Sequence, residues 1–505
     1  MTDSLFIRFS VSLFANFMRS GVSFSAGLLV AQGLGPEHYG IMMFLLGTFG
    51  AVRQLIDSGS SSAFFTFLSR QERSQKFVLS FFVWLGLQFA VPFLFVAWLF
   101  PDELVDLIWK SDQRATVLMA FLASYAQSTL WSVVSQMAEA QRLTRRVQLA
   151  SLSVTVFYFF AILIFFSFNF LTVELVFLLI SLQWLTAVAL VGVKLRYRQK
   201  WNAGESTRGI FYEFKDYCIP LIPYAWVSFL YEFADRWLLQ EFGGAVEQAY
   251  YSVAFQFGAI ASIATTSILN IFWKEIADSF HRNEKQQLEK LFNRVSRSMV
   301  FVASAVGCLL VPWSGEILTL MLDERYSDGQ YALMLMLMYP IHQSLGQVSG
   351  AVAYATGLVG IYAKLGILMM GVSVAATYWV LADETGLIPG LGLGSKGLAF
   401  KMLFMQIISV SLLYHALSKK LSIKVEWSYQ IFVPVFCLIS SISAVWVSNL
   451  ILPDASAWYT RFGVASLFFL VILVKFLVTH PNLAGLHRDD FERVAVSLRK
   501  LTNFH

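Results

Sequence analysis

Residues Gln148–Val193 read QLASLSVTVFYFFAILIFFSFNFLTVELVFLLISLQWLTAVALVGV, and this stretch decides the fold class. It contains a single charged residue, Glu174, and divides into two apolar runs near 148–168 and 171–193. About 20 consecutive apolar residues cross the hydrocarbon core of a bilayer as one helix. Each run is therefore predicted to be a membrane-spanning helix.

The rest of the chain has the same apolar character. Of its 505 residues, 57% are hydrophobic and 14% are charged, and the mean hydropathy is +0.63. An ordinary soluble protein has about 25% charged residues. A soluble core of this length could not hide 47 Phe, 14 Trp and 19 Tyr from water. The composition thus excludes a soluble globular protein.

Apolar runs recur along the whole chain and predict an all-α integral membrane protein with about fourteen transmembrane helices. They lie near 11–31, 40–58, 77–99, 115–138, 148–168, 171–193, 216–240, 249–272, 298–321, 331–356, 358–381, 395–416, 428–450 and 457–478. Spans of about 20 residues leave only short connections in a chain of this length. No separate soluble domain is expected.

The longest polar insert divides the predicted spans into six before it and eight after it. We predict an N-terminal bundle at 1–193, a cytoplasmic linker at 194–215, a C-terminal bundle at 216–416, a helix pair at 428–478 and an amphipathic cytoplasmic tail at 479–505. A weak repeat also relates the two bundles. Leu34-Gly35 follows the first span as Gly243-Gly244 follows the seventh, each a few residues before a Tyr.

Lys and Arg in the short connections predict the orientation of the chain. With the N-terminus inside, 28 Lys and Arg fall in inside segments and 5 in outside loops, so both termini are predicted to be cytoplasmic. The apolar stretch after Arg8 is interrupted by Arg19, which indicates a retained span and not a cleaved signal peptide. The simplest location is a bacterial inner membrane. The same rule accounts for the basic faces, so no nucleic acid partner is expected.

The sequence carries no recognisable motif for a metal, nucleotide or catalytic site. Cys218, Cys308 and Cys437 are far apart, and the seven His residues form no HxxxH or HExxH pattern. No GxGxxG or GxxxxGK[ST] loop is present. No connection is large enough to hold an active site. We therefore predict a protein that is not an enzyme and has no metal or organic cofactor.

Charged residues inside the predicted spans are the candidate functional residues. An Arg, Lys or Asp at the centre of a span costs about 2.5–3.5 kcal/mol on insertion scales, so such residues usually face a cavity or a partner. In the first span Asn16 and Arg19 share a polar stripe, and Arg19 has no carboxylate within four residues on its helix. The second span carries Arg53 and Asp57, four residues apart.

Two later spans add further charges. In the seventh span Ser228, Glu232, Asp235 and Arg236 are predicted to share one face, and the twelfth span holds Lys401. The Glu232 and Arg236 side chains could form an intramembrane ion pair that joins two helices. Arg53 and Lys401 could instead extend to the cytoplasmic interface. Cations on several helices suit a phosphate or diphosphate ligand. This pattern indicates transport of an anion and not catalysis.

Several segments together resemble a known transporter family. Ala15-Asn16 through Arg19-Ser20, then Leu34-Gly35-Pro36-Glu37-His38-Tyr39-Gly40, then Asp57-Ser58-Gly59 resemble the opening of the Wzx-type polysaccharide flippases. These proteins belong to the multidrug/oligosaccharidyl-lipid/polysaccharide (MOP) exporter superfamily. Asp235-Arg236-Trp237 followed by Gly243-Gly244 resembles their seventh-to-eighth span segment.

The resemblance implies a two-lobed bundle around a cationic cavity that alternates between inward-open and outward-open states. Its cargo would be an undecaprenyl diphosphate-linked oligosaccharide, moved beside a polysaccharide polymerase and a chain-length regulator. By matching position, Asn16, Arg19, Asp57, Asp235 and Arg236 inherit candidate roles. Arg19 and Arg236 would attract the diphosphate, while Asp57 and Asp235 would balance charge or respond to a coupling ion, H⁺ or Na⁺.

Three other functions stay open from the sequence. A small-molecule antiporter of the same superfamily would favour carboxylates over cations in its path. A lipid II flippase is a nearer alternative within the superfamily. A membrane glycan polymerase or ligase is a different class, and it usually needs a larger outside loop than any in this chain.

Overall fold

The structure is a computed structural model. It describes residues 5–70, 73–110, 113–193, 195, 206–282, 284–386, 388–424, 426–453 and 457–485. Within these ranges the side chains of 5–15, 260–275, 277 and 281 are not described. The predicted tail from 486 onward and most of the predicted linker before 206 lie outside the described residues.

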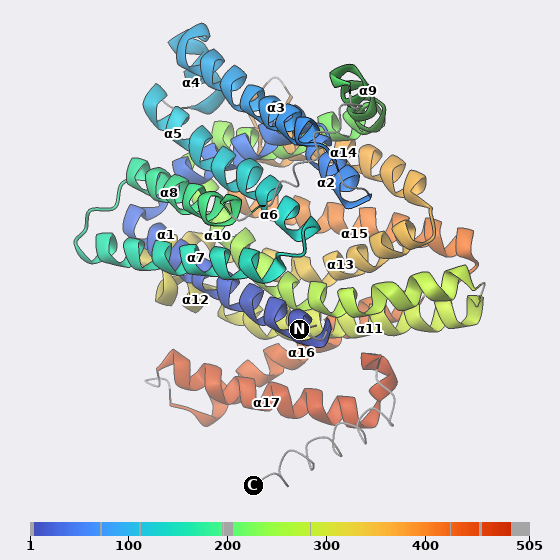
Figure 1. The fold of residues 1–505 in the computed structure, drawn as a ribbon. Helices are drawn as coiled ribbons and strands as arrows, with labels where there is room; N and C mark the ends of the chain where they lie inside the picture. The colour runs from blue at the N-terminus through green and yellow to red at the C-terminus, as the bar shows by residue number, and fades with distance from the viewer. Residues whose placement is uncertain are drawn as a thin grey trace, which may run out of the picture. The chain divides into compact units, whose positions relative to one another are not determined.

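The described part of the chain is built from helices joined by short connections (Figure 1). The first α-helices are α1 Leu5–Asp57, α2 Ser60–Arg70, α3 Gln75–Leu94, α4 Asp102–Trp109, α5 Arg114–Ser124, α6 Trp131–Ala140, α7 Thr144–Ser167, α8 Val173–Gly192 and α9 Thr207–Cys218. The later ones are α10 Ile222–His281, α11 Lys285–Leu310, α12 Ser314–Met321, α13 Gln330–Ala355, α14 Val359–Leu381, α15 Gly394–Leu421, α16 Trp427–Ile451 and α17 Trp458–Thr479.

Short helical segments link or extend these helices. Two are π-helical, η1 Phe95–Leu99 and η2 Tyr125–Leu130. Four are 3₁₀ segments, namely η3 Ile219–Leu221, η4 Val311–Trp313, η5 Glu324–Gly329 and η6 Pro481–Ala484. With η1 and η2 included, α3 and α5–α6 become continuous helices long enough to cross a bilayer.

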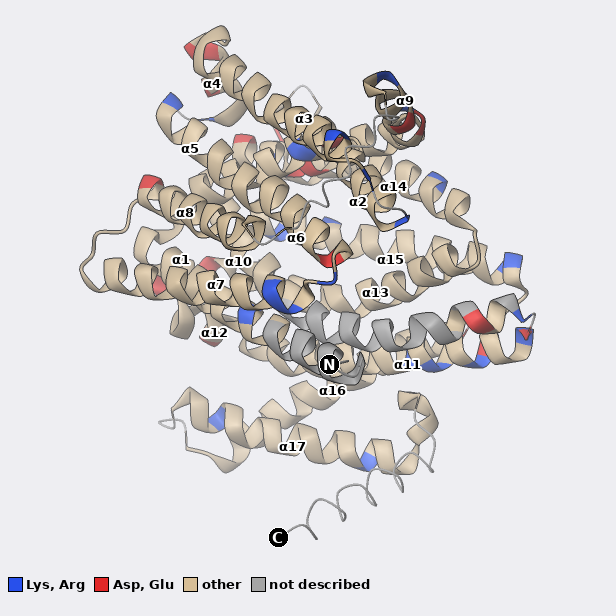
Figure 2. Cartoon of the chain, viewed as in Figure 1, with Lys and Arg blue, Asp and Glu red and all other residues tan. Residues whose placement is uncertain are grey.

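The predicted all-α membrane fold is confirmed. The predicted apolar runs fall on helices, with two runs each on α1 and α10. By length and composition, ten helical stretches of the described chain can span a membrane. Figure 2 shows Lys, Arg, Asp and Glu mainly at helix ends and on short helices such as α4 and α9, while the long helices are mostly uncharged. This distribution is that of helices surrounded by lipid.

Two long helices each contain one sharp kink at a glycine. Gly35 in α1 has φ 73° and ψ 168°, and Gly244 in α10 has φ 76° and ψ −175°. This backbone region is essentially accessible to Gly alone. Pro36 then begins the second half of α1, where its missing N–H is tolerated. The two kinks have nearly the same backbone geometry, which strengthens the repeat expected from the sequence.

The chain divides into two compact units. The first contains Met1–Ser252 and Met370–Ser395, and the second contains Val253–Met369 and Lys396–His505. The helix α10 therefore begins in the first unit and continues into the second. The bundles predicted at 1–193 and 216–416 are a different division, based on span count, and they stay a prediction.

The first unit has an aromatic core that also holds α9. Phe64 stacks on Phe81 with ring centroids 4.0 Å apart. Phe214 of α9 packs 5.4 Å from Phe67 of α2, and Glu213 of α9 pairs with Arg73 next to α3. The polar stretch predicted as a linker thus ends in an amphipathic helix that is fixed to the first unit.

The second unit is centred on α11, α13, α16 and α17. Phe436 of α16 stacks on Phe476 of α17 at 4.4 Å. Midway along α11, Arg297 binds both carboxylate oxygens of Glu426 and donates to the Asn482 carbonyl at 2.8 Å. These contacts fix the ends of α16 and η6 to α11.

Candidate functional site

Most of the predicted site residues lie in the first unit, where the second half of α1 packs against the first half of α10. Gly40 of α1 approaches the backbone of α10 closely, since a Cβ at Gly40 would lie 1.7 Å from the Ala245 carbonyl oxygen. Seven residues later, a Cβ at Gly47 would lie 2.3 Å from Cζ and Nε of Arg236. Small residues are typical where membrane helices approach this closely.

The same seam continues one heptad further as hydrogen bonds. Ser228 donates to the Gln54 side-chain oxygen at 2.5 Å. The Gln54 amide is also a hydrogen-bond partner of Glu232. We call the contacts of Gly40, Gly47 and Gln54 with α10 the α1–α10 seam. Since α1 rises in number as α10 falls, the two segments are antiparallel.

The ion pair considered between Glu232 and Arg236 does not form. In the described part of the chain these side chains make no ion pair within 4 Å. Glu232 uses Gln54 instead, and the Arg236 side chain passes across Gly47. The Arg236 side chain is therefore positioned by packing against α1, while Glu232 acts on its charge from beyond ion-pair distance.

Asp235 faces a different neighbour from the other charged residues of α10. Its Oδ1 lies 2.5 Å from the Thr377 hydroxyl of α14, and both side chains are buried. Thr377 also lies 2.8 Å from the Ser373 carbonyl oxygen. Ser228, Glu232, Asp235 and Arg236 fall within an arc of about 100° on a helix of 3.6 residues per turn. Asp235 lies at the edge of this arc that meets α14.

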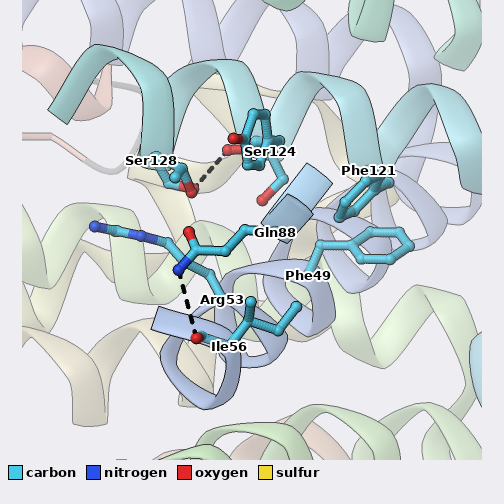
Figure 3. Close-up of a pocket in the computed structure, with 9 residues that line it drawn as sticks. Phe49, Arg53, Ile56, Gln88, Phe121, Ser124 and Ser128 are labelled. Atoms are coloured by element: carbon cyan, nitrogen blue, oxygen red, sulfur yellow. Dashed lines mark hydrogen bonds between the residues drawn. The ribbon is translucent and has the colours of Figure 1, made fainter. Parts of the chain in front are cut away.

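Arg53 lies beside a small pocket between α1, α3, α5 and the π-helical segment η2. Its lining residues are Phe49, Arg53, Ile56, Gln88, Phe121, Ser124, Tyr125, Ser128 and Thr129. Figure 3 shows the Arg53 side chain extending past Gln88 and below Ser128, away from Phe49 and Phe121. The pocket volume is about 20 Å³, which is room for one water molecule. It has no room for a sugar in this conformation.

Asp57 has a local structural role. Its Oδ1 accepts hydrogen bonds from the Ser60 hydroxyl at 2.8 Å, the Ser61 backbone N–H at 3.0 Å and the Ser61 hydroxyl at 2.7 Å. A carboxylate in this position caps the free N–H groups at the start of α2. Ser60 also accepts from Gln88 and Trp84 of α3, at 3.2 and 3.1 Å. Asp57 therefore ties three helices together.

The remaining predicted residues have simpler surroundings. Asn16 and Arg19 on α1 are half-buried, and Arg19 forms no ion pair with any described residue. Lys401 on α15 is 2% exposed, so its side chain lies inside the protein and does not extend to the surface. Lys401 belongs to the second unit.

A second set of contacts fixes the end of the seam near the Gly244 kink. Lys110, which follows α4, pairs with Glu241 of α10 at 2.5 Å. The Lys110 ammonium also lies 5.2 Å from the Trp237 ring centroid, and the Trp237 indole donates to the Leu107 carbonyl at 3.3 Å. Trp237 follows Arg236 directly on α10 and Glu241 lies four residues after Trp237, so this part of α10 is held firmly.

Sequence reasoning missed four residues that contact the predicted ones. Gln54, Gln88 and Thr377 are polar residues within apolar runs, and their cost in a membrane is a usable signal. Gly47 has no such signal, since a glycine in an apolar run is ordinary. Its contact with Arg236 depends on which helix lies opposite.

Comparison with solved structures identifies the fold. A lipid II flippase MurJ in an inward closed conformation aligns with a TM-score of 0.69 at 13% identity, covering 94% of this chain and 99% of that one. An inward-facing multidrug resistance MATE transporter of the MOP superfamily aligns at 0.58 with 15% identity, over 79% and 95%.

A MOP superfamily transporter from Pyrococcus furiosus, described by a reversed polarity of its binding pocket, aligns at 0.56 with 13% identity, over 82% and 95%. No protein-family profile matches the sequence, and no curated protein sequence matches it. The similarity thus extends over most of the chain, but it is a similarity of architecture alone. The chain has the fold of the membrane transporters of the MOP superfamily.

Proposed function

We propose that this protein is a lipid-linked oligosaccharide flippase. Its cargo is an undecaprenyl diphosphate-linked oligosaccharide, which it moves from the cytoplasmic to the outer leaflet of a bacterial inner membrane by alternating access. The MOP transporter fold supports transport, and the charge of the predicted path supports an anionic cargo.

One observation carries this proposal. Arg19, Arg53 and Arg236 lie within apolar helices of the first unit, and none forms an ion pair within 4 Å with a described residue. An unpaired arginine at membrane depth is costly, so it is kept where a mobile anion supplies the countercharge. Guanidinium groups bind phosphate oxygens through paired, charge-assisted hydrogen bonds.

Asp235 is our candidate for the response to a coupling ion. The buried Thr377 hydroxyl lies within hydrogen-bond distance of both the Asp235 carboxylate and the Ser373 carbonyl, so the three oxygen atoms form one group. Oxygen atoms are the ligands that hard cations prefer, and a carboxylate also binds a proton. Asp57 is less suited to this role, because three donors already occupy its Oδ1 atom.

The test is transfer of a fluorescent undecaprenyl diphosphate-linked oligosaccharide between leaflets of proteoliposomes. We expect transfer by the wild type and a loss of about tenfold or more in Arg19→Ala and Arg236→Ala, since a hydrogen bond to a charged group is worth about 1.5–3 kcal/mol. Arg325→Ala is the control, because this arginine is 55% exposed outside the spans. Wild-type transfer by both path variants, at equal protein level, would contradict the proposal.

The same vesicles separate the alternatives. Transfer of lipid II in place of the oligosaccharide carrier would favour a lipid II flippase. Exchange of a cationic drug for H⁺ or Na⁺, without lipid transfer, would favour a small-molecule antiporter. A change in glycan chain length or attachment in cells would favour a polymerase or ligase. A further arm with Asp235→Asn is expected to remove the dependence of transfer on the coupling ion.

A further inference from the structure

We propose that Gly47 is a positioning residue, which seats the Arg236 side chain across α1 and so sets where its guanidinium meets the anionic group of the cargo. This inference rests on the proposed function, in which Arg236 attracts a diphosphate. It adds a residue that carries no charge and that contacts no cargo itself.

The geometry at Gly47 leaves no room for any side chain. A Cβ at this position would lie 2.3 Å from Cζ, 2.3 Å from Nε and 2.4 Å from Cδ of Arg236. The guanidinium end of Arg236 therefore lies directly against the backbone of α1. Arg236 forms no ion pair within 4 Å in the described part of the chain, so this contact restrains the position of its charge at close range.

Contacts of the neighbouring residues fix the backbone of α10 around Arg236. Ser228 and Glu232, two turns and one turn before Arg236 on α10, are both hydrogen-bonded to Gln54 of α1. On the other side of Arg236, the next residue Trp237 and Glu241, five residues after Arg236, are held by the segment around Lys110. The backbone of α10 is thus fixed to the first unit on both sides, and the free variable is the direction of the Arg236 side chain.

A methyl group at Gly47 should move the guanidinium without unfolding the protein. The atoms it would meet are the far end of a flexible side chain, which can rotate away. Alanine also favours a helix over glycine. The expected result of Gly47→Ala is a protein at least as stable as the wild type, with its cationic group displaced.

The same helix supplies two matched comparisons. A Cβ at Gly50, three residues further on, meets nothing within 4 Å. A Cβ at Gly40 would lie 1.7 Å from the Ala245 backbone oxygen, which cannot rotate away. Gly50→Ala is therefore expected to be neutral, and Gly40→Ala is expected to lower the unfolding temperature.

The experiment compares these three variants in transfer kinetics and in thermal unfolding. For Gly47→Ala we expect an apparent KM for the lipid-linked oligosaccharide raised about tenfold, with the unfolding temperature unchanged or higher. A structural defect would instead lower the maximal rate, because less protein would be active. In the Gly47→Ala background, Arg236→Lys is expected to restore part of the affinity, since the narrower ammonium end can pass the methyl group.

A binding measurement tests the positioning of Arg236 by Gly47 without requiring transport. Farnesyl diphosphate binding to purified protein, followed by tryptophan fluorescence, is expected to weaken about tenfold in Gly47→Ala and not in Gly50→Ala. Equal binding by both variants, or a Gly47→Ala variant as unstable as Gly40→Ala, would overturn the proposal, as would a wild type that binds no farnesyl diphosphate. A wild type that binds this probe but transfers no glycan would contradict the proposed function alone.

Discussion

Charged residues within the membrane-spanning helices of this protein serve different purposes. Asp57 has a structural role within the protein, since its Oδ1 atom accepts hydrogen bonds from both Ser60 and Ser61 at the start of α2. Arg236 has no such partner and lies against a glycine. A high cost in the membrane is common to both, so cost alone does not separate a structural charge from a transport charge.

Replacing Asp57 by Ala should therefore destabilise the protein. We expect a loss of about 1–2 kcal/mol, because a helix cap and its hydrogen bonds are removed. Asp57→Asn keeps an acceptor oxygen and should lose less. Thermal unfolding in detergent measures both. An unchanged unfolding temperature in Asp57→Ala would exclude the capping role, whereas impaired transfer by a stable Asp57→Asn would assign a function to the charge.

Among the elements, α1 and α10 organise the first unit. Each joins two apolar runs through one kinked glycine, with nearly equal backbone angles at Gly35 and Gly244. The kink lets a helix change direction without a loop whose polar groups would need partners. Because α10 continues into the second unit, Gly244 lies close to the point where the chain passes between the units.

The kink geometry makes Gly244→Ala a specific test of backbone conformation. A Cβ at Gly244 meets nothing within 4 Å, so the substitution introduces no clash with a neighbour. Its φ of 76° still disfavours any L-residue, and we expect a loss of about 1–3 kcal/mol. Gly50→Ala, in regular helix, is the control and should be neutral or slightly stabilising. Equal unfolding temperatures for the two variants would contradict the kink.

Across the whole molecule, the ion pairs agree with the predicted alternation of spans. Arg73–Glu213 and Arg297–Glu426 each join two segments predicted to be cytoplasmic. Lys110–Glu241 joins two segments predicted to lie outside. One miscounted helix between the partners would place them on opposite sides of the membrane. The pairs therefore support the predicted order of sides, and the excess of inside Lys and Arg supports its direction.

Cysteine labelling in intact cells tests this topology. In a background with the three native cysteines replaced by Ser, Glu384→Cys should react with an impermeant maleimide from outside, since this residue follows α14 in an exposed connection. Lys420→Cys, exposed near the end of α15, should react only after the membrane is permeabilised. The reverse pattern would invert the orientation, and labelling of both sites in intact cells would refute the alternation.

The sequence by itself determined the class of this protein. Helices in a membrane follow from local composition, because a run of about 20 apolar residues has a lower free energy in lipid than in water wherever it packs. The amphipathic spacing and the free-energy cost of a charge in the membrane likewise identified Arg19, Asp57, Asp235 and Arg236 as candidate functional residues.

The partner of each of these residues was decided by tertiary structure alone. Helical periodicity gives the angle between Asp235 and Arg236 on α10, but not that α14 lies beside one and α1 beside the other. Asp235 meets Thr377 across 142 positions of sequence, and Arg236 meets a glycine that no pattern marks. Such contacts depend on which helices are neighbours, and in a membrane nearly every helix is equally apolar, so hydrophobicity carries little information about that choice.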